Sequence, residues 1–300
     1  MTNSKLFAQL LSKLEENLAL LPDKPEETHE VTLKSLWLKA QGKSISAERA
    51  VHQKLSRLNA VQENLVKELL EKRIEGVPLA HITGRQLFMG IELITNSKAL
   101  IPRKETEILG NFAVKSLSNI TGTSSNSTIV FDVCCGAGNL AIAIAKNEPN
   151  IKVYASDLSE EAVSLTNENI HFHKLENQIK AFSGDLLEPF EKEEFYNKVD
   201  LIVCNPPYIS NFTVLKMAKE IADYEPEMAF KGGGLLGLNI VQNLIKNAVR
   251  FLRNGGMLIF EIGLGQGNYI VNLCKKFGLY QSVVTETDND GHIRVIGVRK

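Results

Sequence analysis

The stretch DVCCGAGNLA, residues 132–141, decides the fold of this chain. It follows TIVFDV (128–133), an apolar run typical of a buried strand, and leads into NLAIAIAKN (139–147), a helix-like segment. Gly136, Gly138 and Ala141 satisfy the spacing G-x-G-x-x-G/A. Glycine allows a tight turn and lets a ligand approach the backbone closely, although tight packing alone would also explain such a turn. A strand, a glycine turn and a helix in this order indicate an α/β sheet.

Strand-like and helix-like segments continue to alternate after this unit. We expect strands at 151–157, 179–185, 199–205 and 255–263, and a helix over 159–175. Apolar strands separated by helices predict a parallel sheet covered on both faces. The last two strands, 280–288 and 292–300, are linked by Asn289, Asp290 and Gly291 and are typical of an antiparallel hairpin.

The first part of the chain has a different pattern. Residues 1–82 carry leucines three and four apart, which predicts helices over 5–21, 31–42 and 46–76, with Gly42 and Gly76 as stops. Short β-rich runs between 78 and 107 are punctuated by Gly84 and Gly90 and indicate a hairpin. We therefore expect a small helical domain at 1–82, a β-hairpin linker at 83–103 and the α/β domain at 104–300.

Composition narrows the class of protein. The chain has 300 residues, 44% hydrophobic and 23% charged, as in ordinary globular proteins, and its net charge of −1 argues against stable nucleic-acid binding. No apolar run approaches the roughly 20 residues that span a bilayer, so no membrane association is expected. The four cysteines form no C-x-x-C pair. Packing thiols in a reducing compartment fit best, which favours a cytoplasmic protein.

Acidic residues follow three of the predicted strands and indicate a cofactor site. Asp132 precedes the glycine turn, Asp157 ends the next strand and Asp185 ends the third. Ligands of open α/β sheets bind along this carboxyl edge. Asp157 can hold ribose hydroxyls, and Asp185 with Leu186 can hold an adenine ring. The glycine turn alone suits NAD or S-adenosylmethionine. A carboxylate at Asp132 favours S-adenosylmethionine, which is cationic, over NAD, whose pyrophosphate is negatively charged. The alternative is that Asp132 is simply a satisfied polar group at the strand end.

The stretch NPPY, residues 205–208, follows the fourth strand of this domain. The Asn205 side chain offers one acceptor oxygen, and proline rigidity would fix the carbonyl of Pro206 as a second acceptor. Two acceptors can bind a planar substrate NH2 group, and Tyr208 can stack on it. Such a site suits methyl transfer to a conjugated nitrogen by positioning and charge stabilisation. A plain turn that ends the strand is the alternative.

These motifs carry a family resemblance. The pattern DVCCGAGN…SD…GD…NPPY resembles class I S-adenosylmethionine-dependent amino-methyltransferases, which act on nucleic-acid bases or on glutamine side chains. Residues 76–109 closely resemble the corresponding segment of peptide chain release factor N5-glutamine methyltransferases. Residues 224–238, 255–266 and 288–300 are similar to the same family. The resemblance covers about residues 30–300.

The resemblance implies a Rossmann-like, seven-stranded methyltransferase sheet with a helical substrate-recognition domain. It implies S-adenosylmethionine as cofactor, S-adenosylhomocysteine as product, and the glutamine of the Gly-Gly-Gln motif in class 1 release factors as substrate. No metal is implied. The expected cofactor-binding residues are Asp132, Cys134, Cys135, Gly136, Ala137, Gly138, Asp157, Leu158, Asp185, Leu186 and Asn205. The expected substrate-binding residues are Asn205, Pro206, Pro207 and Tyr208, of which Asn205, Pro206 and Tyr208 are the expected catalytic residues.

This chain also departs from the family pattern. Cys134 and Cys135 stand where a glycine and a small hydroxyl residue are usual, and Lys104 stands where a proline is usual. An amino-methyltransferase that acts on another protein, a small molecule or a nucleic-acid base is the alternative function. Arg103 and Glu105, beside Lys104, are candidates to approach the active crevice or to form a plain ion pair.

Overall fold

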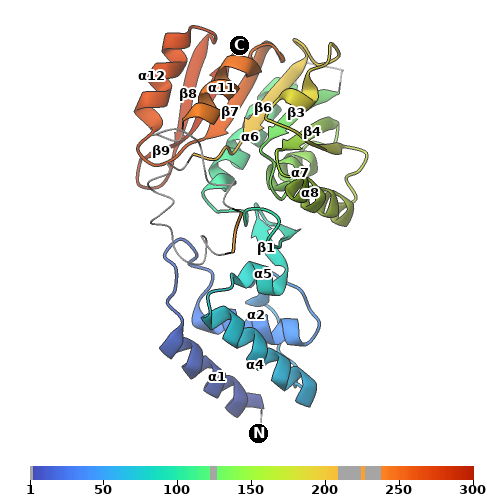
Figure 1. Cartoon of the computed structure of the whole chain (residues 1–300), viewed down its shortest axis with the longest axis vertical. Helices are drawn as coiled ribbons and strands as arrows, with labels where there is room; N and C mark the ends of the chain where they lie inside the picture. Colours follow the sequence, from blue (N-terminus) through green and yellow to red (C-terminus); the bar gives the residue numbers. More distant parts are fainter. Residues whose placement is uncertain (1–2, 122–126, 209–223, 227–237) are drawn as a thin grey trace. The chain divides into compact units, whose positions relative to one another are not determined.

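The structure is a computed structural model that describes residues 3–121, 127–208, 224–226 and 238–300 (Figure 1). The chain divides into two compact units, Met1–Ser97 with Ala218–Glu225, and Lys98–Met217 with Pro226–Lys300. The boundary after Ser97 falls within the predicted linker. Most of the family-like segment 224–238 lies outside the described residues.

The described part of the first unit is a helical bundle followed by a hairpin. Its helices are α1 (Asn3–Asn17), α2 (His29–Ala40), α3 (Ala47–Ala50), α4 (Ala60–Ile74) and α5 (Leu79–Thr83). The antiparallel strands β1 (Arg85–Phe88) and β2 (Ile91–Ile94) complete the unit. Leucines spaced at three and four bury one stripe of each longer helix around Trp37, which is 1% exposed.

A helix cap explains why the segment predicted as one helix forms two separate helices, α3 and α4. The segment 46–76 was expected to be helical throughout, but α3 ends at Ala50 and α4 begins at Ala60. Asn59 and Gln62 form a capping box, because each side chain bonds to the backbone N–H of the other at 3.0 Å. Capping satisfies N–H groups that the first turn leaves without partners, so the chain starts a new helix here.

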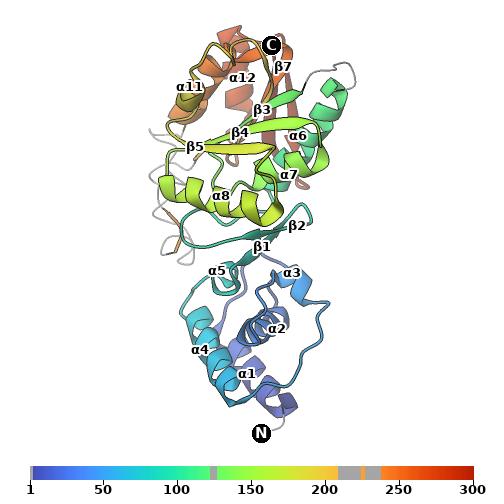
Figure 2. The same ribbon diagram turned by 90° about the vertical axis from the view of Figure 1, so that its right-hand side faces the viewer.

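The described part of the second unit is an α/β sheet (Figure 2). Its strands are β3 (Thr128–Val133), β4 (Ile151–Asp157), β5 (Ile179–Ser183), β6 (Val199–Cys204), β7 (Leu252–Glu261), β8 (Ser282–Thr287) and β9 (Ile293–Arg299). The spatial order is β5-β4-β3-β6-β7-β9-β8. Strands β3 to β7 pair in parallel, and β9 pairs antiparallel with β7 and with β8. The predicted fold class and terminal hairpin are confirmed.

Helices cover both faces of this sheet (Figures 1 and 2). Helices α6 (Thr106–Thr121), α7 (Asn139–Asn147) and α8 (Glu160–His173) pack side by side on one face. Helices α11 (Asn239–Ala248) and α12 (Gly267–Phe277) cover the other, where Phe131, Phe251 and Phe260 join their apolar residues in one core. The short 3₁₀-helix η1 (Glu188–Phe190) adds Phe190 to this core. No helix among the described residues is long and apolar enough to cross a membrane.

The strand order creates a switch point between β3 and β6. The chain proceeds from β3 outward through β4 and β5, then returns to the far side of β3 as β6. Val133 of β3 pairs with Ser156 of β4 and with Cys204 of β6, so these three strands end at one level. Open α/β sheets bind ligands at the carboxyl edge beside such a reversal.

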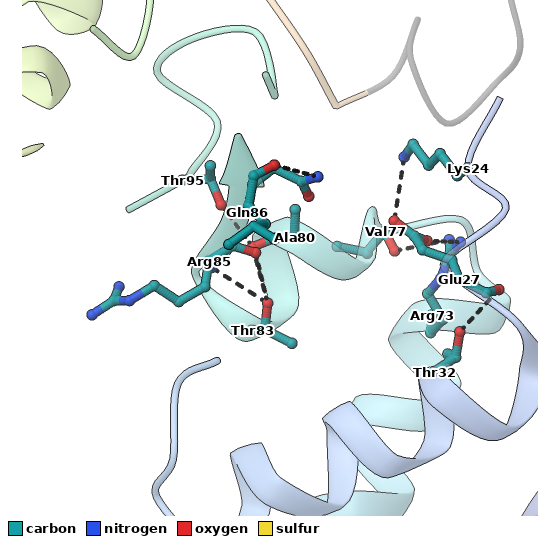
Figure 3. Close-up of polar contacts among 11 residues, drawn as sticks. Lys24, Glu27, Thr32, Arg73, Val77, Ala80, Thr83, Arg85, Gln86 and Thr95 are labelled. Atoms are coloured by element: carbon teal, nitrogen blue, oxygen red, sulfur yellow. Dashed lines mark hydrogen bonds and ion pairs between the residues drawn. The ribbon is translucent and has the colours of Figure 1, made fainter. Parts of the chain in front are cut away.

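A buried ion pair lies inside the helical unit (Figure 3). Arg73 of α4 is 2% exposed, and its Nη2 lies 3.0 Å from Oε2 of Glu27, which precedes α2. Lys24 lies 3.8 Å from the other carboxylate oxygen, and Arg73 Nη1 also donates to the Val77 carbonyl. Removing one partner of a buried pair leaves a charge without compensation in a medium of low polarity.

We expect Arg73→Met to lower the free energy of unfolding of the helical unit by about 3 kcal/mol. Urea unfolding followed by the fluorescence of Trp37, the single tryptophan, reports on this unit. Lys13→Met is the matched control, because Lys13 pairs with Glu71 on the surface, where exposed pairs contribute about 0.2–1 kcal/mol. Equal effects of the two substitutions would contradict the assignment.

Candidate active site

A cavity of about 230 Å³ opens at the carboxyl edge of the sheet, within the second unit. The loop after β3 contributes Cys134, Cys135, Gly136 and Ala137 to its wall. The ends of the next strands contribute Asp157, Leu158, Asp185, Leu186, Asn205 and Pro207. Residues predicted from four separate motifs therefore line one cavity, as the common level of the strand ends requires. Gly138, Asp132, Pro206 and Tyr208 are not part of this lining.

Side chains from α8 and β4 hold the glycine loop in place. Thr166 Oγ1 donates to the Gly136 carbonyl at 2.8 Å, and Asn169 Nδ2 donates to the Ala137 carbonyl at 3.0 Å. Both side chains are fully buried. Gly138 has a φ of +77°, and a Cβ there would lie 2.9 Å from Thr166 Cγ2, so only glycine fits. Gly138 was expected to bind the cofactor, but it lies at the N-cap of α7 and does not line the cavity.

The two cysteines of the loop occupy different environments. Cys134 lines the cavity and adopts a φ of +59°, a left-handed conformation that disfavours residues with a Cβ. Cys135 is buried, and burial raises the pKa of its thiol well above the usual value. All four cysteines are free.

The Asp157 carboxylate lies at the centre of the site. Its Oδ2 accepts from the Gly136 N–H at 2.9 Å, and its Oδ1 accepts from the Ser159 N–H at 3.0 Å. Burial raises the pKa of Asp157, and these backbone donors act in the opposite direction. Ser156 Oγ donates to the Leu186 carbonyl at 2.7 Å and so ties the loop that carries Asp185 and Leu186 to β4.

Asp132 differs from its predicted place. Its side chain is fully buried, and its Oδ2 accepts from the Ala141 N–H in the first turn of α7 at 2.9 Å. It therefore contacts the backbone of α7, but its Oδ1 is buried without a hydrogen-bond partner, so only one of its two oxygens fits the alternative of a satisfied polar group. Burial raises the pKa of Asp132 to about 7, since a carboxylate with few donors is poorly stabilised there.

The NPPY stretch follows β6 as expected, and its first and last residues have defined hydrogen-bond partners. Asn205 lines the cavity, and its Nδ2 donates to Thr106 Oγ1 at 3.0 Å. Tyr208 instead donates its hydroxyl to Glu261 Oε1 at 3.0 Å. Burial and the neighbouring Glu261 raise the Tyr208 pKa above its usual value. This contact involves the phenol oxygen only, so the stacking of the Tyr208 ring on a substrate amide stays a prediction.

The lining residues fit S-adenosylmethionine by their chemistry. Gly136, with a φ of +55°, would point a Cβ into open space, so its missing side chain leaves room at the loop for a ligand. The Asp157 and Asp185 carboxylates suit hydroxyl and amino donors, and the apolar side chains of Leu140, Leu158 and Leu186 suit a ring and a thioether-like chain.

Comparison with known proteins identifies the family. Release factor glutamine methyltransferase of Thermodesulfovibrio yellowstonii is 33% identical over 81% of this chain and 84% of its own length. The enzyme of the same name from Chlamydia trachomatis is 32% identical, covering 81% and 79%. The chain belongs to the release factor glutamine methyltransferase family. Residues 111–236 also match the family model "Methyltransferase small domain".

Solved structures support the methyltransferase fold. Human methyltransferase 10 domain containing protein superposes with a TM-score of 0.51 at 16% identity, covering 81% of this chain and 98% of that one. The hMettl16 catalytic domain gives a TM-score of 0.54 at 13% identity, covering 77% and 81%. The predictions of a Rossmann-like methyltransferase and of an S-adenosylmethionine-dependent enzyme are confirmed for this member of the release factor glutamine methyltransferase family.

Several residues at the site carried no clear sequence signal. Thr166 and Asn169 lie in an ordinary amphipathic helix, and Thr106 and Glu261 contact the NPPY stretch from distant segments. Arg103, a sequence candidate, does line the cavity. Thr106 is a polar residue in the first turn of α6, the helix that follows the linker. This position was the only sequence feature that could have indicated a role at the site.

One cluster of metal-ligand type occurs among the described residues: Asp288, Asp290 and His292. It lies in the turn between β8 and β9, where Asp288 Oδ1 accepts the backbone N–H groups of Asp290 and His292. Hydrogen bonding within the turn accounts for this arrangement.

The raised pKa of Asp132 predicts a pH-dependent stability. Its folded-state pKa of about 7 exceeds the ordinary 3.8, so the folded protein binds the proton more tightly between these values. Its contribution to stability is then present at low pH and is lost as the pH rises toward 7. We expect the stability of Asp132→Asn relative to the wild type to increase as the pH rises from 5 to 8. Differential scanning calorimetry of both proteins over this range measures the difference. A constant difference across this range would contradict the assignment.

Proposed function

We propose that this chain transfers a methyl group from S-adenosylmethionine to the side-chain amide nitrogen (N5) of a glutamine in a peptide chain release factor. The observation that carries the proposal is the Asn205 amide, which lines the cavity beside the glycine loop while its Nδ2 is bound to Thr106. Membership of the release factor glutamine methyltransferase family supports the substrate class.

The cofactor would supply an electrophilic methyl group on a sulfonium cation. The loop Cys134–Ala137 and Leu186 would bind it, with Asp157 accepting from its ribose hydroxyls. Thr166, Asn169 and Ser156 already hold these loops in the protein without cofactor. Cofactor binding therefore costs little conformational entropy in the loop backbone.

Asn205 would orient the substrate. With Nδ2 donating to Thr106, the Asn205 oxygen is left to accept one N–H of the glutamine amide. The proposal assigns the other N–H to the Pro206 carbonyl. Two acceptors that favour a pyramidal nitrogen direct its lone pair along the methyl-transfer path, which is catalysis by positioning and electrostatic stabilisation.

Release factors are the proposed partners, with the Gly-Gly-Gln glutamine as the acceptor and the helical unit as the part that recognises the factor. The cytoplasm, where translation takes place, is the proposed location, and the four free thiols suit a reducing compartment. The near-neutral net charge supports a protein substrate over a nucleic acid.

The direct test is incubation with labelled S-adenosylmethionine and a purified class 1 release factor. We expect one methyl group on the glutamine of the Gly-Gly-Gln motif, located by mass spectrometry, and none on a factor with Gln→Ala at that position. Equal label on both factors would refute the site, and label on an oligonucleotide at physiological salt would favour the alternative activity.

Two substitutions separate binding from turnover. We expect Asn205→Ala to lower kcat at least about 100-fold, since losing a transition-state acceptor costs about 3–4 kcal/mol, with little change in cofactor affinity. Asp157→Ala should instead raise the cofactor Kd at least about tenfold, as expected for lost hydrogen bonds to a charged group. Turnover and isothermal calorimetry measure the two effects. Activity of Asn205→Ala within a few-fold of wild type would refute the acceptor role.

A further inference from the structure

We propose that Gln266 is a positioning residue that holds the last residue of the NPPY stretch and thereby fixes the direction of the Pro206 carbonyl. The inference rests on the proposed function, because that carbonyl is the second acceptor assigned to the substrate amide. It gives a role to the turn GLGQG, residues 263–267, which leads from β7 into α12.

The turn and the NPPY stretch leave neighbouring strands at the same edge of the sheet. Cys204 of β6 pairs in parallel with Phe260 of β7, so the segments that follow these residues emerge side by side. Asn205 and Pro207 of the first segment line the cavity, and residues 263–267 of the second are not part of that lining. Any effect of the turn on the reaction must therefore act through the NPPY stretch.

The Gln266 side chain joins the turn to the NPPY stretch by two hydrogen bonds. Its Oε1 accepts from the Gly263 N–H at 2.9 Å, and its Nε2 donates to the Tyr208 carbonyl at 3.1 Å. A backbone N–H only donates and a backbone carbonyl only accepts, so the two contacts together settle which end of the Gln266 amide faces which partner. Turning the amide over would oppose donor to donor and acceptor to acceptor.

Two further contacts hold Tyr208 against the same part of the chain. Its hydroxyl donates to Oε1 of Glu261, the last residue of β7, at 3.0 Å. A Cβ on Gly263 would lie 3.0 Å from Tyr208 Cδ2 and 3.1 Å from Gln266 Oε1, so the ring and the amide pack closely over a residue that has no side chain. Tyr208 is thus held through its carbonyl, its hydroxyl and its ring.

The two prolines make the NPPY stretch rigid, so its position depends on both of its ends. Proline fixes its own φ at about −65°, and a residue that precedes proline is restricted to extended conformations. The segment Asn205–Pro207 therefore moves nearly as one body. Thr106 holds its first residue, and Gln266 holds Tyr208 at its far end. Because a rigid segment held at a single point can pivot, the Pro206 carbonyl keeps a fixed direction only while both ends are held.

The kinetic test compares two substitutions of Gln266. Gln266→Met removes both hydrogen bonds at similar size, and Gln266→Glu keeps the acceptor for Gly263 but puts a second acceptor in front of the Tyr208 carbonyl. We expect both to lower kcat at least about tenfold, because a displaced acceptor no longer meets the reacting nitrogen. The cofactor Kd should stay within about twofold of wild type, since the turn does not line the cavity. A kcat of Gln266→Met within about twofold of wild type would overturn the proposal.

Gln178→Met is the matched control, because Gln178 also donates its side-chain amide to a backbone carbonyl, that of Pro149, at 3.2 Å in the same unit. Gln178 directly precedes β5 and Pro149 lies just before β4, so this contact is at the amino edge of the sheet, opposite the cavity. Its kcat should stay within about twofold of wild type at a temperature where all variants are folded. Equal losses in this control and in Gln266→Met would show a general effect of stability and would refute the positioning role.

A second readout needs neither cofactor nor release factor. In protein labelled with ¹⁵N-glycine, the Gly263 signal is assigned by its absence in Gly263→Ala. We expect slow hydrogen exchange of this N–H in the wild type and in Gln266→Glu, which keep the acceptor, and faster exchange in Gln266→Met. Equal exchange in all three proteins would contradict the contact on which the inference depends.

The other half of the contact is read at the Tyr208 carbonyl. In protein labelled with ¹³C at the tyrosine carbonyl, the Tyr208 signal is assigned by its absence in Tyr208→Phe. It should shift in both Gln266 variants, because each removes the donor to this carbonyl, and an unchanged shift would refute the inference. If both signals responded as expected while the wild type left the release factor unmethylated, the contacts of Gln266 would stand and the proposed function would be wrong.

Discussion

The common level at which β3, β4 and β6 end is the constraint on which the site depends. Val133 pairs with both Ser156 and Cys204, so the loop after β3, Asp157 and Asn205 emerge side by side although they are far apart in the chain. A shift of one residue in either pairing would turn the side chains of a strand to the opposite face. The buried apolar side chains of these strands, such as Val130, Val153 and Ile202, would lose their packing and so oppose such a shift.

Buried polar side chains then convert this shared edge into a shaped site. Thr166, Asn169 and Ser156 each donate to a backbone carbonyl of a loop that lines the cavity. Loops that follow strands would otherwise lose conformational entropy when a ligand binds. Because the donors sit on α8 and β4, packing of the helix against the sheet fixes the loops before any ligand arrives. Asp132 accepts from the Ala141 N–H and so ties the end of β3 to the first turn of α7.

The contacts of the NPPY stretch show how a local motif depends on distant segments. Asn205 could present either its oxygen or its NH2 group to a ligand, and the motif itself does not choose. Thr106 accepts from the Asn205 amide, whereas Tyr208 donates to Glu261, which also lies 3.7 Å from Arg294. A buried polar group favours the orientation that meets its partner, so these contacts from distant segments restrict Asn205 and Tyr208.

The sequence alone determined the strand and helix order of the second unit, the carboxyl edge as the site, and the family, because apolar periodicity and short motifs are local properties. It missed the break between α3 and α4, where a capping box outweighs helical spacing. It also placed Asp132 beside the ligand, whereas the structure turns Asp132 to the α7 backbone, and it gave no sign that the Tyr208 hydroxyl donates to Glu261. Hydrogen-bond partners that are distant in the chain leave no local pattern, so only the tertiary structure decided which polar groups face the cavity.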